Sequence, residues 1–438
     1  MLNFKVPLND MRFVMNEVFD YPAHYRHLGG AEEATPELVD AIMQAAATYS
    51  EEVLAPLYTR GDAEGCHFQA GQVSTPQGYV QAYRQFIEGG WQSLSYPPAY
   101  GGQGLPMSLN LIKSEMMGTA NWAFNMYPGL SIGCINTILQ YGTEDIKKAY
   151  LPQLISGAWT GTMCLTEPQC GSDLAQVKTQ AQPLGDGRYA LTGTKIFISS
   201  GDHDLTDNIV HIVLARLPDA PRGTRGISLF IVPKFMVNAD GSLGARNDVH
   251  CVSIEHKLGI KGSPTGIIRL DEVRVPDANR IGEVGEGFAI AMHTLDRSRP
   301  TIGAQAVGVA QGALDYAIGY MKERKTFGRP IATNQGLQWM VADAAMKVEA
   351  ARNLVYRACA LVDERDPHGD LGKIGAMAKA FASDVAMQVT TDCVQLLGGY
   401  GYTEEFPVER MMRDAKITQI YEGTNQIQRM VIAKKLFG

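Results

Sequence analysis

A short polar segment near the C-terminus contains the residue best suited to acid–base chemistry. Residues 420–428 read IYEGTNQIQ, so that one carboxylate, Glu422, stands among hydroxyl and amide side chains. A carboxylate held away from water can act as a general base. The run is equally typical of a helix start, with Thr424 or Asn425 as the cap and Glu422 solvated before it. The segment alone leaves both interpretations open.

Two segments in the middle of the chain suit a flat heteroaromatic ligand. Residues 164–173 read CLTEPQCGSD, and a turn with hydroxyls and free backbone N–H groups could hold a ring edge and a pyrophosphate. Residues 195–201, KIFISSG, alternate and predict a strand with Phe197 and Ser199 on one face. An ordinary β-turn and a core Phe beside a solvated Ser are the alternatives at these positions.

Two further segments end long helical stretches. Residues 323–331 read ERKTFGRPI, and Gln335 follows. Cationic residues at a helix C-terminus are favourable in themselves, but the Thr-Phe-Gly run and Gln335 favour contact with a nucleotide on a neighbouring subunit. Residues 395–402 read QLLGGYGY. A C-cap explains one glycine, whereas three in four positions permit a ligand to approach the backbone closely.

Composition limits the classes of function. The 438 residues are 45% hydrophobic, which predicts two or three domains with large cores. Charged residues make up only 19% and the net charge is −7. This balance argues against a nucleic-acid partner, and a phosphorylated ligand would need a local site.

The seven cysteines are scattered without a Cys-x-x-Cys pair or a His cluster at metal-ligand spacing. They therefore predict free thiols in a reducing cytoplasm and no metal site. The N-terminus has no basic region leading into an apolar run, so we expect no signal peptide. No uncharged apolar run reaches membrane-spanning length, about 18 residues or more, so we expect no membrane span.

Hydrophobic periodicity predicts the elements that position these segments. Helical spacing begins at Pro36 and recurs at 75–90, 107–120, 122–140 and 143–156. Near residue 160 the helical periodicity ends, and short segments rich in Ile, Val, Phe and Thr predict strands. From about residue 281 it returns to long helices, typical of an up-and-down bundle. The predicted strands lie at 160–165, 189–191, 195–200, 208–217, 226–233 and 266–275, and the long helices at 285–325, 338–365 and 371–397.

We therefore predict a multidomain α+β chain in four parts. An N-terminal arm at 1–35 precedes an α-helical domain at 36–159. A middle domain at 160–280 forms an antiparallel β-barrel or sandwich, and residues 281–438 form a four-helix bundle. We assign no chemistry to the arm.

Taken in order, the segments resemble the acyl-CoA dehydrogenase family from about Pro36 to the C-terminus. The resemblance is carried by LTEPxxGSD at 165–173, RKTFG at 324–328, QLxGGxGY at 395–402, and MRDAK at 412–416 followed by YEGTNQIQ. As a set these motifs are highly specific.

The resemblance implies a flavoprotein that binds FAD and oxidises an acyl-CoA thioester to the trans-2-enoyl-CoA. Glu422 matches the glutamate that removes the α-proton, while the β-hydrogen leaves as hydride to flavin N5. The thioester oxygen would be held by the Glu422 backbone N–H and a flavin hydroxyl. Some members carry the base on a bundle helix. That position is Ser298 here, and serine cannot serve, so Glu422 is the single candidate.

Residue matching extends the expected site to cofactor and substrate contacts. We expect FAD to contact two groups of residues, the second partly from an adjacent subunit, and the acyl-CoA to contact a third. The first group is Met163, Leu165, Thr166, Gly171, Ser172, Phe197, Ile198 and Ser199. The second is Arg324, Lys325, Thr326, Phe327, Gln335, Gln395, Gly398, Gly399, Thr424, Asn425 and Gln426. The substrate group is Ser172, Asp296, Arg299, Tyr421 and Gly423.

The family resemblance also implies partners. A homo-oligomer, dimer or tetramer, and an electron-transfer flavoprotein as electron acceptor are expected. An acyl-CoA oxidase, or a flavin-binding scaffold with impaired turnover, are the alternatives.

The two parts of the chain resemble different members. Residues up to about 265 are similar to larger bacterial members with an additional C-terminal domain, whereas residues 267–438 are similar to the shorter type. We interpret this as a recombined or engineered chain, or a natural intermediate.

Overall fold

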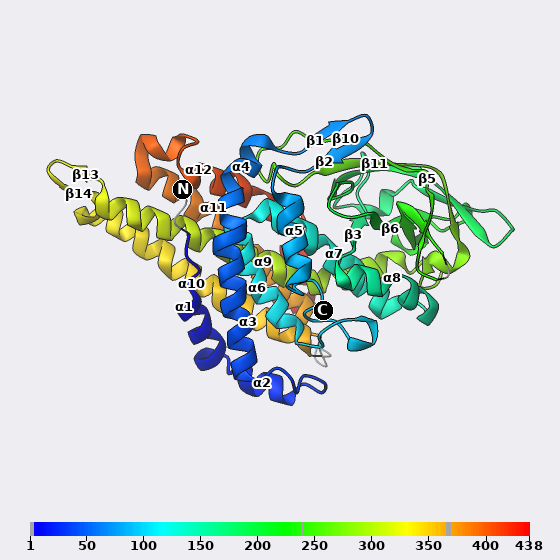
Figure 1. Ribbon diagram of the computed structural model, residues 1–438, viewed down its shortest axis with the longest axis horizontal. Helices are drawn as coiled ribbons and strands as arrows, with labels where there is room; N and C mark the ends of the chain where they lie inside the picture. The colour runs from blue at the N-terminus through cyan, green and yellow to red at the C-terminus, as the bar shows by residue number, and fades with distance from the viewer. Residues whose placement is uncertain (1–3, 239, 365–368) are drawn as a thin grey trace.

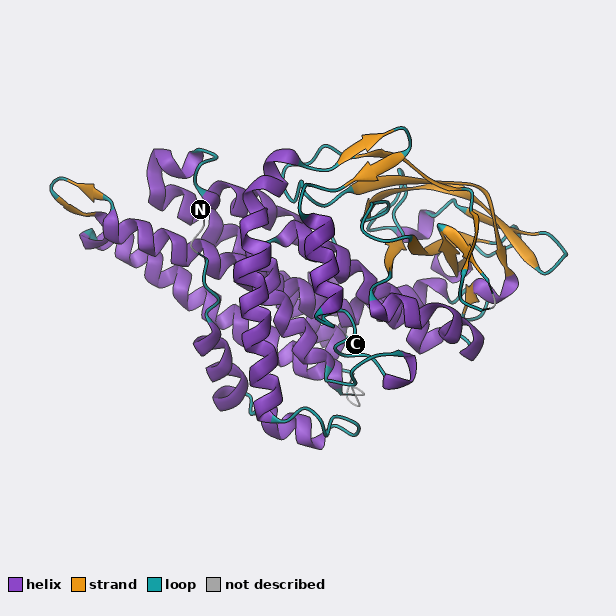
Figure 2. Ribbon diagram, in the orientation of Figure 1, coloured by secondary structure: helices purple, strands orange, loops and turns teal. Residues whose placement is uncertain are grey.

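The computed structural model describes residues 4–238, 240–364 and 369–438. Helices occupy one side of the molecule and a β-sheet the other (Figures 1 and 2). In chain order a helical region is followed by the sheet and then by a second helical region. The α+β fold with a middle β-domain between helical parts is therefore as predicted.

The N-terminal residues form short helices on the surface of the helical part. α1 spans Leu8–Phe13, a π-helical turn follows at Val14–Val18, and α2 spans Tyr21–His27. The buried Tyr21 hydroxyl donates to the Tyr356 carbonyl at 2.7 Å. This contact joins the beginning of the chain to the C-terminal helical region.

The first helical region continues through Pro56, where the proline pattern predicted an end or a kink. Thr35 caps α3, accepting a hydrogen bond from Leu38 N at 3.3 Å. The helix does not stop at Pro56, because a π-helical turn at 50–54 leads into a new helix that tolerates Pro in its first turn. The helices are α3 Pro36–Tyr49, α4 Ala55–Glu64, α5 Tyr79–Glu88, α6 Met107–Ala120, α7 Trp122–Tyr141 and α8 Glu144–Ser156, with a hairpin of β1 His67–Gln69 and β2 Gln72–Ser74.

The middle region is one main sheet in the order β10-β11-β5-β4-β6-β7-β12, with β3 beside β6. Most pairs are antiparallel, but β3 and β6 run parallel, and the described strands do not close into a barrel. β6 and β7 are buried almost throughout, so both faces are covered. The strands are β3 Trp159–Cys164, β4 Gln180–Pro183, β5 Arg188–Ser199, β6 Asn208–Arg216, β7 Ile227–Pro233, β10 Val249–Ile254, β11 Thr265–Pro276 and β12 Arg280–Ile281, with a separate hairpin of β8 Phe235–Val237 and β9 Leu243–Arg246.

Three long helices build the C-terminal region. They are α9 Gly287–Glu323, α10 Gln335–Asp363 and α11 Leu371–Leu397. Between α9 and α10 a small hairpin projects beyond the bundle (Figure 1). Two shorter helices, α12 and α13, pack against α11. The hairpin consists of β13 Lys325–Thr326 and β14 Arg329–Pro330, and the shorter helices are α12 Pro407–Ala415 and α13 Asn425–Phe437.

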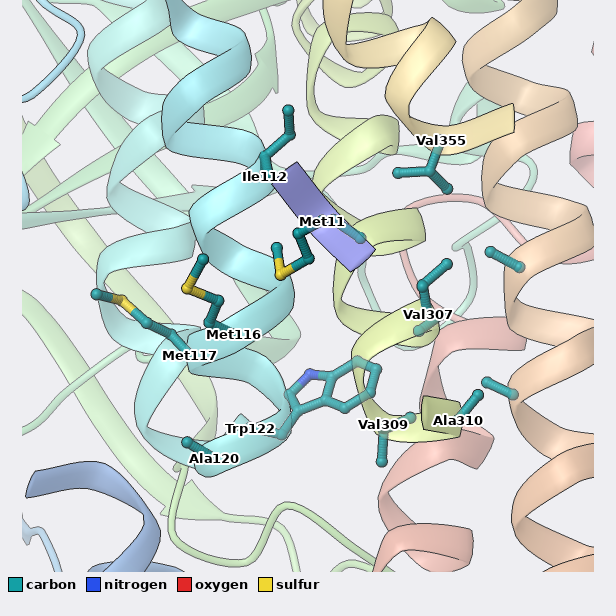
Figure 3. Packing of buried hydrophobic residues seen from close by; sticks show 14 of the residues in the cluster. Met11, Ile112, Met116, Met117, Ala120, Trp122, Val307, Val309, Ala310 and Val355 are labelled. Atoms are coloured by element: carbon teal, nitrogen blue, oxygen red, sulfur yellow. The ribbon is translucent and has the colours of Figure 1, made fainter. Parts of the chain in front are cut away.

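The two helical regions share one hydrophobic core. Figure 3 shows Ile112 and Met116 of α6 facing Val307 of α9, with Trp122 beneath them. A buried ion pair at 2.9 Å between Arg352 and Glu115 also joins the regions. This shared core fixes the C-terminal helices relative to the first helical region.

No helix in the described part of the chain has the length and apolar character needed to cross a bilayer.

Candidate active site

Glu422 lies in a tight turn between α12 and α13. It adopts a left-handed backbone conformation, with φ 55°, and Gly423 continues it with φ 83°. A residue with a Cβ rarely adopts this conformation, and such strain is found most often at functional sites. The Ser298 hydroxyl on α9 donates to Glu422 Oε2 at 2.8 Å. The carboxylate is thereby directed toward α9.

Burial controls the charge of Glu422. Loss of water around the carboxylate raises the pKa of Glu422 above its ordinary value. The Ser298 hydrogen bond and the charges of Arg299 and Lys379 lower it, without cancelling the effect of burial. A carboxylate with a raised pKa is a stronger base when ionised, which suits the removal of a weakly acidic proton.

Polar groups from α11 and α13 hold the backbone of this turn. The buried Lys379 ammonium donates to the Gly423 carbonyl at 2.8 Å and to Asn425 Oδ1 at 3.0 Å. Gln428 Nε2 donates to the Glu422 and Gly423 carbonyls, at 3.0 and 2.9 Å. The turn is therefore fixed from two sides.

The helix-start interpretation of this segment is partly correct. The Thr424 hydroxyl caps α13 by accepting a hydrogen bond from Ile427 N at 3.3 Å. Asn425 is buried, and its amide nitrogen donates to Ser383 Oγ and Asp384 Oδ1, both at 2.8 Å. Asn425 thus has a structural role, while Gln426 is exposed.

Of the predicted substrate residues, Tyr421 and Gly423 flank Glu422 in the turn, and Asp296 and Arg299 lie on α9. Arg299 is buried on α9 and forms an ion pair with Asp296. Its charge lowers the pKa of Glu422, so it lies near the carboxylate. Tyr421 precedes the base directly, and burial raises the pKa of its hydroxyl. Ser172, in contrast, is exposed on a loop of the β-domain.

A buried ion pair anchors the loop that carries Thr166, Gly171 and Ser172. Burial opposes ionisation of Glu167, but the Lys195 ammonium, 2.8 Å from its Oε1, lowers the pKa of Glu167 to about 2. The Glu167 carboxylate also accepts hydrogen bonds from the Thr179 hydroxyl at 2.6 Å and from Lys178 N at 2.7 Å. These bonds hold the buried part of the loop in place, while Gly171 and Ser172 are exposed.

The strand that carries Phe197 is irregular, which the sequence pattern did not predict. β5 and β11 shift register between the pairs Gly266–Ile198 and Ile268–Lys195, and Phe197 has φ 57°. This bulge leaves the Phe197 side chain 59% exposed, whereas Ile198 is buried and Ser199 is half-buried. An exposed aromatic face beside a hydroxyl results.

The other expected FAD residues cluster at the far end of the bundle. The Arg324 guanidinium lies 5.2 Å from the centre of the Tyr400 ring. Gln395, Gly398 and Gly399 are exposed beside this ring. Lys325, Thr326 and Phe327 form the β13–β14 hairpin, and Gln335 begins α10.

The β-domain FAD residues and those around the β13–β14 hairpin lie at opposite ends of the molecule, whereas Thr424, Asn425 and Gln426 begin α13 next to Glu422. Figure 1 shows the β13–β14 hairpin beyond one end of the bundle and the sheet beyond the other. The structure therefore brings Arg299 and Ser298 to Glu422 but does not bring Arg324 to Phe197 within one chain.

The residues near the sheet fit a flavin ring. Met163 and Leu165 are partly exposed apolar side chains at the end of β3, and the Phe197 ring faces outward. Thr166 and Ser199 add partly exposed hydroxyls. Apolar and aromatic surfaces with a few polar groups are typical of cofactor sites. Among the described residues, no group of three or more His, Cys, Asp or Glu side chains is placed to hold a metal ion.

Sequence reasoning missed two partners of Glu422. The sequence indicates Ser298 only as an unsuitable base, yet its hydroxyl donates a hydrogen bond to the Glu422 carboxylate. The sequence gives no signal for Lys379, because a lysine within an apolar helix has no local feature that indicates its partner. Only the distant segment 422–425 reveals its role.

A half-buried carboxylate with a raised pKa in the helical bundle, together with exposed aromatic and hydroxyl groups on the β-domain, is the set of groups that a flavoprotein oxidoreductase needs. Three family models match the chain: the N-terminal domain of acyl-CoA dehydrogenase at residues 36–158, the middle domain at 162–273 and the C-terminal domain at 285–437. The chain belongs to the acyl-CoA dehydrogenase family.

Individual relatives agree with this assignment. The chain is 47% identical to a probable acyl-CoA dehydrogenase of Mycobacterium leprae over 79% of this chain and 85% of that protein. It is 37% identical to 3-methylmercaptopropionyl-CoA dehydrogenase of Ruegeria pomeroyi over 98% of this chain and 75% of the relative. The solved structure of butyryl-CoA dehydrogenase from Megasphaera elsdenii matches with a TM-score of 0.81 and 36% identity, over 92% of this chain and 98% of that one.

Proposed function

We propose that this protein oxidises an acyl-CoA thioester to the trans-2-enoyl-CoA, with Glu422 as the base that removes the α-proton. The observation that carries the proposal is the position of Glu422. Its carboxylate is held by Ser298 at 2.8 Å in a strained turn, and burial raises its pKa. A weakly acidic carbon acid requires a base of this kind.

The backbone of the same turn supplies a second function. Within the described residues, the Glu422 amide N–H has no hydrogen-bond acceptor in the protein. A free N–H can stabilise the thioester oxygen as negative charge develops on it. Proton removal and oxygen stabilisation thus come from adjacent atoms of one turn.

A bound FAD would supply the acceptor for the β-hydrogen, which would leave the substrate as a hydride. Met163, Leu165, Phe197 and Ile198 would contact the ring, and the hydroxyls of Thr166 and Ser199 would bind its polar edge. Gly171 and Ser172 would lie along the phosphates. These assignments follow from the family resemblance and from the exposed aromatic and hydroxyl groups at the sheet.

The remaining FAD contacts come from a second copy of the chain in this proposal. The β13–β14 hairpin lies at the end of the bundle opposite the sheet (Figure 1). Arg324 to Phe327, Gln335, Gln395, Gly398 and Gly399 would therefore contact the FAD held at the sheet of another copy. Phe327 is fully exposed and Trp339 is 63% exposed, and exposed large apolar residues indicate interaction sites. We expect a dimer or tetramer, which light scattering of the purified protein measures directly.

Electrons would pass from the reduced flavin to an electron-transfer flavoprotein, as the family resemblance implies. An oxidase would instead deliver them to oxygen. Peroxide release during aerobic turnover distinguishes the two acceptors, and we expect reduction of the electron-transfer flavoprotein with little peroxide. We also propose a cytoplasmic location, since all seven cysteines are free thiols.

The defining experiment is anaerobic bleaching of the purified yellow protein by acyl-CoAs from short to long chain lengths. We expect rapid loss of the oxidised flavin spectrum with at least one of them. A protein that binds FAD and is bleached by none of them is a scaffold without turnover, and the proposed function is then wrong.

A further inference from the structure

A lysine is fully buried in the middle of α11, close to the proposed base. Lysine is rarely buried unless its ammonium group is paired. Lys379 has 0% exposure, and its Nζ donates to a backbone carbonyl, that of Gly423, and to the side-chain oxygen of Asn425. The ammonium is therefore placed behind the turn that carries Glu422 and not against its carboxylate.

The turn needs such support. Glu422 and Gly423 are consecutive left-handed residues, with φ 55° and 83°, and this conformation is unfavourable for a residue with a Cβ. The turn also has little free space, because a Cβ on Gly423 would lie 2.8 Å from Gln428 Nε2. The hydrogen bonds from Lys379 and Gln428 compensate for the unfavourable backbone.

We propose that Lys379 is a positioning residue for Glu422. Its ammonium group fixes the Glu422–Gly423 turn through the Gly423 carbonyl and Asn425, and so holds the carboxylate where the α-carbon of the substrate is placed. It also provides a positive charge that favours the ionised form of the base. This inference rests on the proposed function, because it assigns Lys379 a part in the same reaction.

The charges that face Glu422 come from two helices. Arg299 acts from α9 and Lys379 from α11, and both lower the pKa of Glu422 against the effect of burial. Burial lowers the pKa of Lys379 to about 8, opposed by the charges of Glu422 and Asp384 and assisted by that of Arg299. Below that pH the lysine is mostly protonated. Neutralising it leaves Arg299 as the remaining cation near the base.

Two variants test this role. Lys379→Met removes the charge and the donor, whereas Lys379→Gln removes the charge and keeps an amide donor. Lys373→Met is the matched control on the same helix, where Lys373 forms a partly exposed ion pair with Asp370 at 2.6 Å. For each protein, FAD content, the anaerobic bleaching rate at saturating acyl-CoA, and its pH dependence from pH 5 to 9 are measured.

We expect both Lys379 variants to retain FAD. Bleaching should slow by about 10- to 100-fold in Lys379→Met, because small displacements of a catalytic group are costly. In the pH profile of the bleaching rate, the midpoint of the low-pH limb should rise by about one unit in both variants. The substrate concentration at half-saturation should change little, and Lys373→Met should behave as the parent.

The outcomes separate the two proposals. If the parent is bleached but Lys379→Met is bleached at the parent rate with the same pH midpoint, Lys379 has no positioning role and only this inference fails. If Lys379→Gln loses FAD or unfolds while Lys373→Met stays folded with FAD bound, Lys379 is needed for folding. That result also overturns the positioning inference. If no acyl-CoA bleaches the parent, the proposed function fails, and this inference with it.

Discussion

The Ser298 hydroxyl lies 2.8 Å from Glu422 Oε2, although 124 residues separate them in the chain. By the family resemblance, Ser298 matches the position at which some members carry the base, and here its hydroxyl donates a hydrogen bond to Glu422, the proposed base. The two positions are thus parts of one site. A hydroxyl at this position stabilises the ionised carboxylate without competing for the proton of the substrate.

Replacing Ser298 by Ala should move the low-pH limb of the bleaching rate to higher pH. The hydroxyl lowers the pKa of Glu422, so its loss raises that pKa, and more alkaline solution is then needed to ionise the base. We expect an upward shift of about one unit, equivalent to roughly 1.4 kcal/mol. Stopped-flow bleaching at a series of pH values measures it.

Ser298→Thr is the control, because threonine retains the hydroxyl. Its pH profile should follow that of the parent. A profile for Ser298→Ala that superimposes on the parent profile would show that the hydrogen bond does not influence the base.

Arg324→Ala should weaken FAD binding by about tenfold or more, because a guanidinium typically binds phosphate through charge-assisted hydrogen bonds. Its position over Tyr400, 5.2 Å from the ring centre, keeps the side chain at the surface of the bundle. Lys322→Ala, two residues earlier in the last turn of α9, is the control and should bind FAD normally. Flavin absorbance after dialysis gives the ratio of FAD to protein. Equal ratios in the two variants would rule out Arg324 as a cofactor ligand.

Glu167→Gln should destabilise the β-domain by about 3–5 kcal/mol, because Lys195 would then be a buried charge without its partner. Both side chains are almost completely buried, with exposures of 3% and 0%. The variant Asp271→Asn, which breaks an exposed pair with Arg269, should have no measurable effect. Urea unfolding monitored by circular dichroism measures the free energy of unfolding of both variants.

The Glu167–Lys195 pair should also make the stability of the fold depend on pH in acid solution. The pKa of Glu167 is about 2 in the folded protein, below the ordinary value of 4.5, so folding favours its ionised form. The resulting stability is present above pH 4.5 and is lost as the pH falls toward 2. Unfolding free energies of parent and Glu167→Gln should therefore converge over this range. A constant difference between them down to pH 2 would contradict this assignment.

The sequence predicted the regular elements well because their signals are local. Helical periodicity located α6, α7 and α11 to within a residue or two, since a helix buries a face that recurs in the sequence. The short strands β4 and β10 were missed, because their few residues make no clear alternation. One strand, β5, was divided in two, because polar threonines interrupt its apolar pattern.

The site was predictable only in part. The motif around Glu422 identified the base, but the left-handed backbone of Phe197 and Glu422 depends on distant hydrogen bonds and has no local signal. The MRDAK segment carried the resemblance without an assigned role. The structure shows Asp414 accepting a hydrogen bond from Tyr58 at 2.7 Å and Arg413 bound to Asp62 at 2.6 Å, so this segment fastens α12 to α4.

The central claim is that Glu422 removes the α-proton. The most direct test is anaerobic bleaching of Glu422→Gln, with FAD content matched to the parent and with the acyl-CoA that bleaches the parent fastest. Glutamine has nearly the same shape but cannot accept the proton, so we expect bleaching to be about 100- to 10,000-fold slower. Bleaching of Glu422→Gln at the rate of the parent would contradict the assignment of Glu422 as the base.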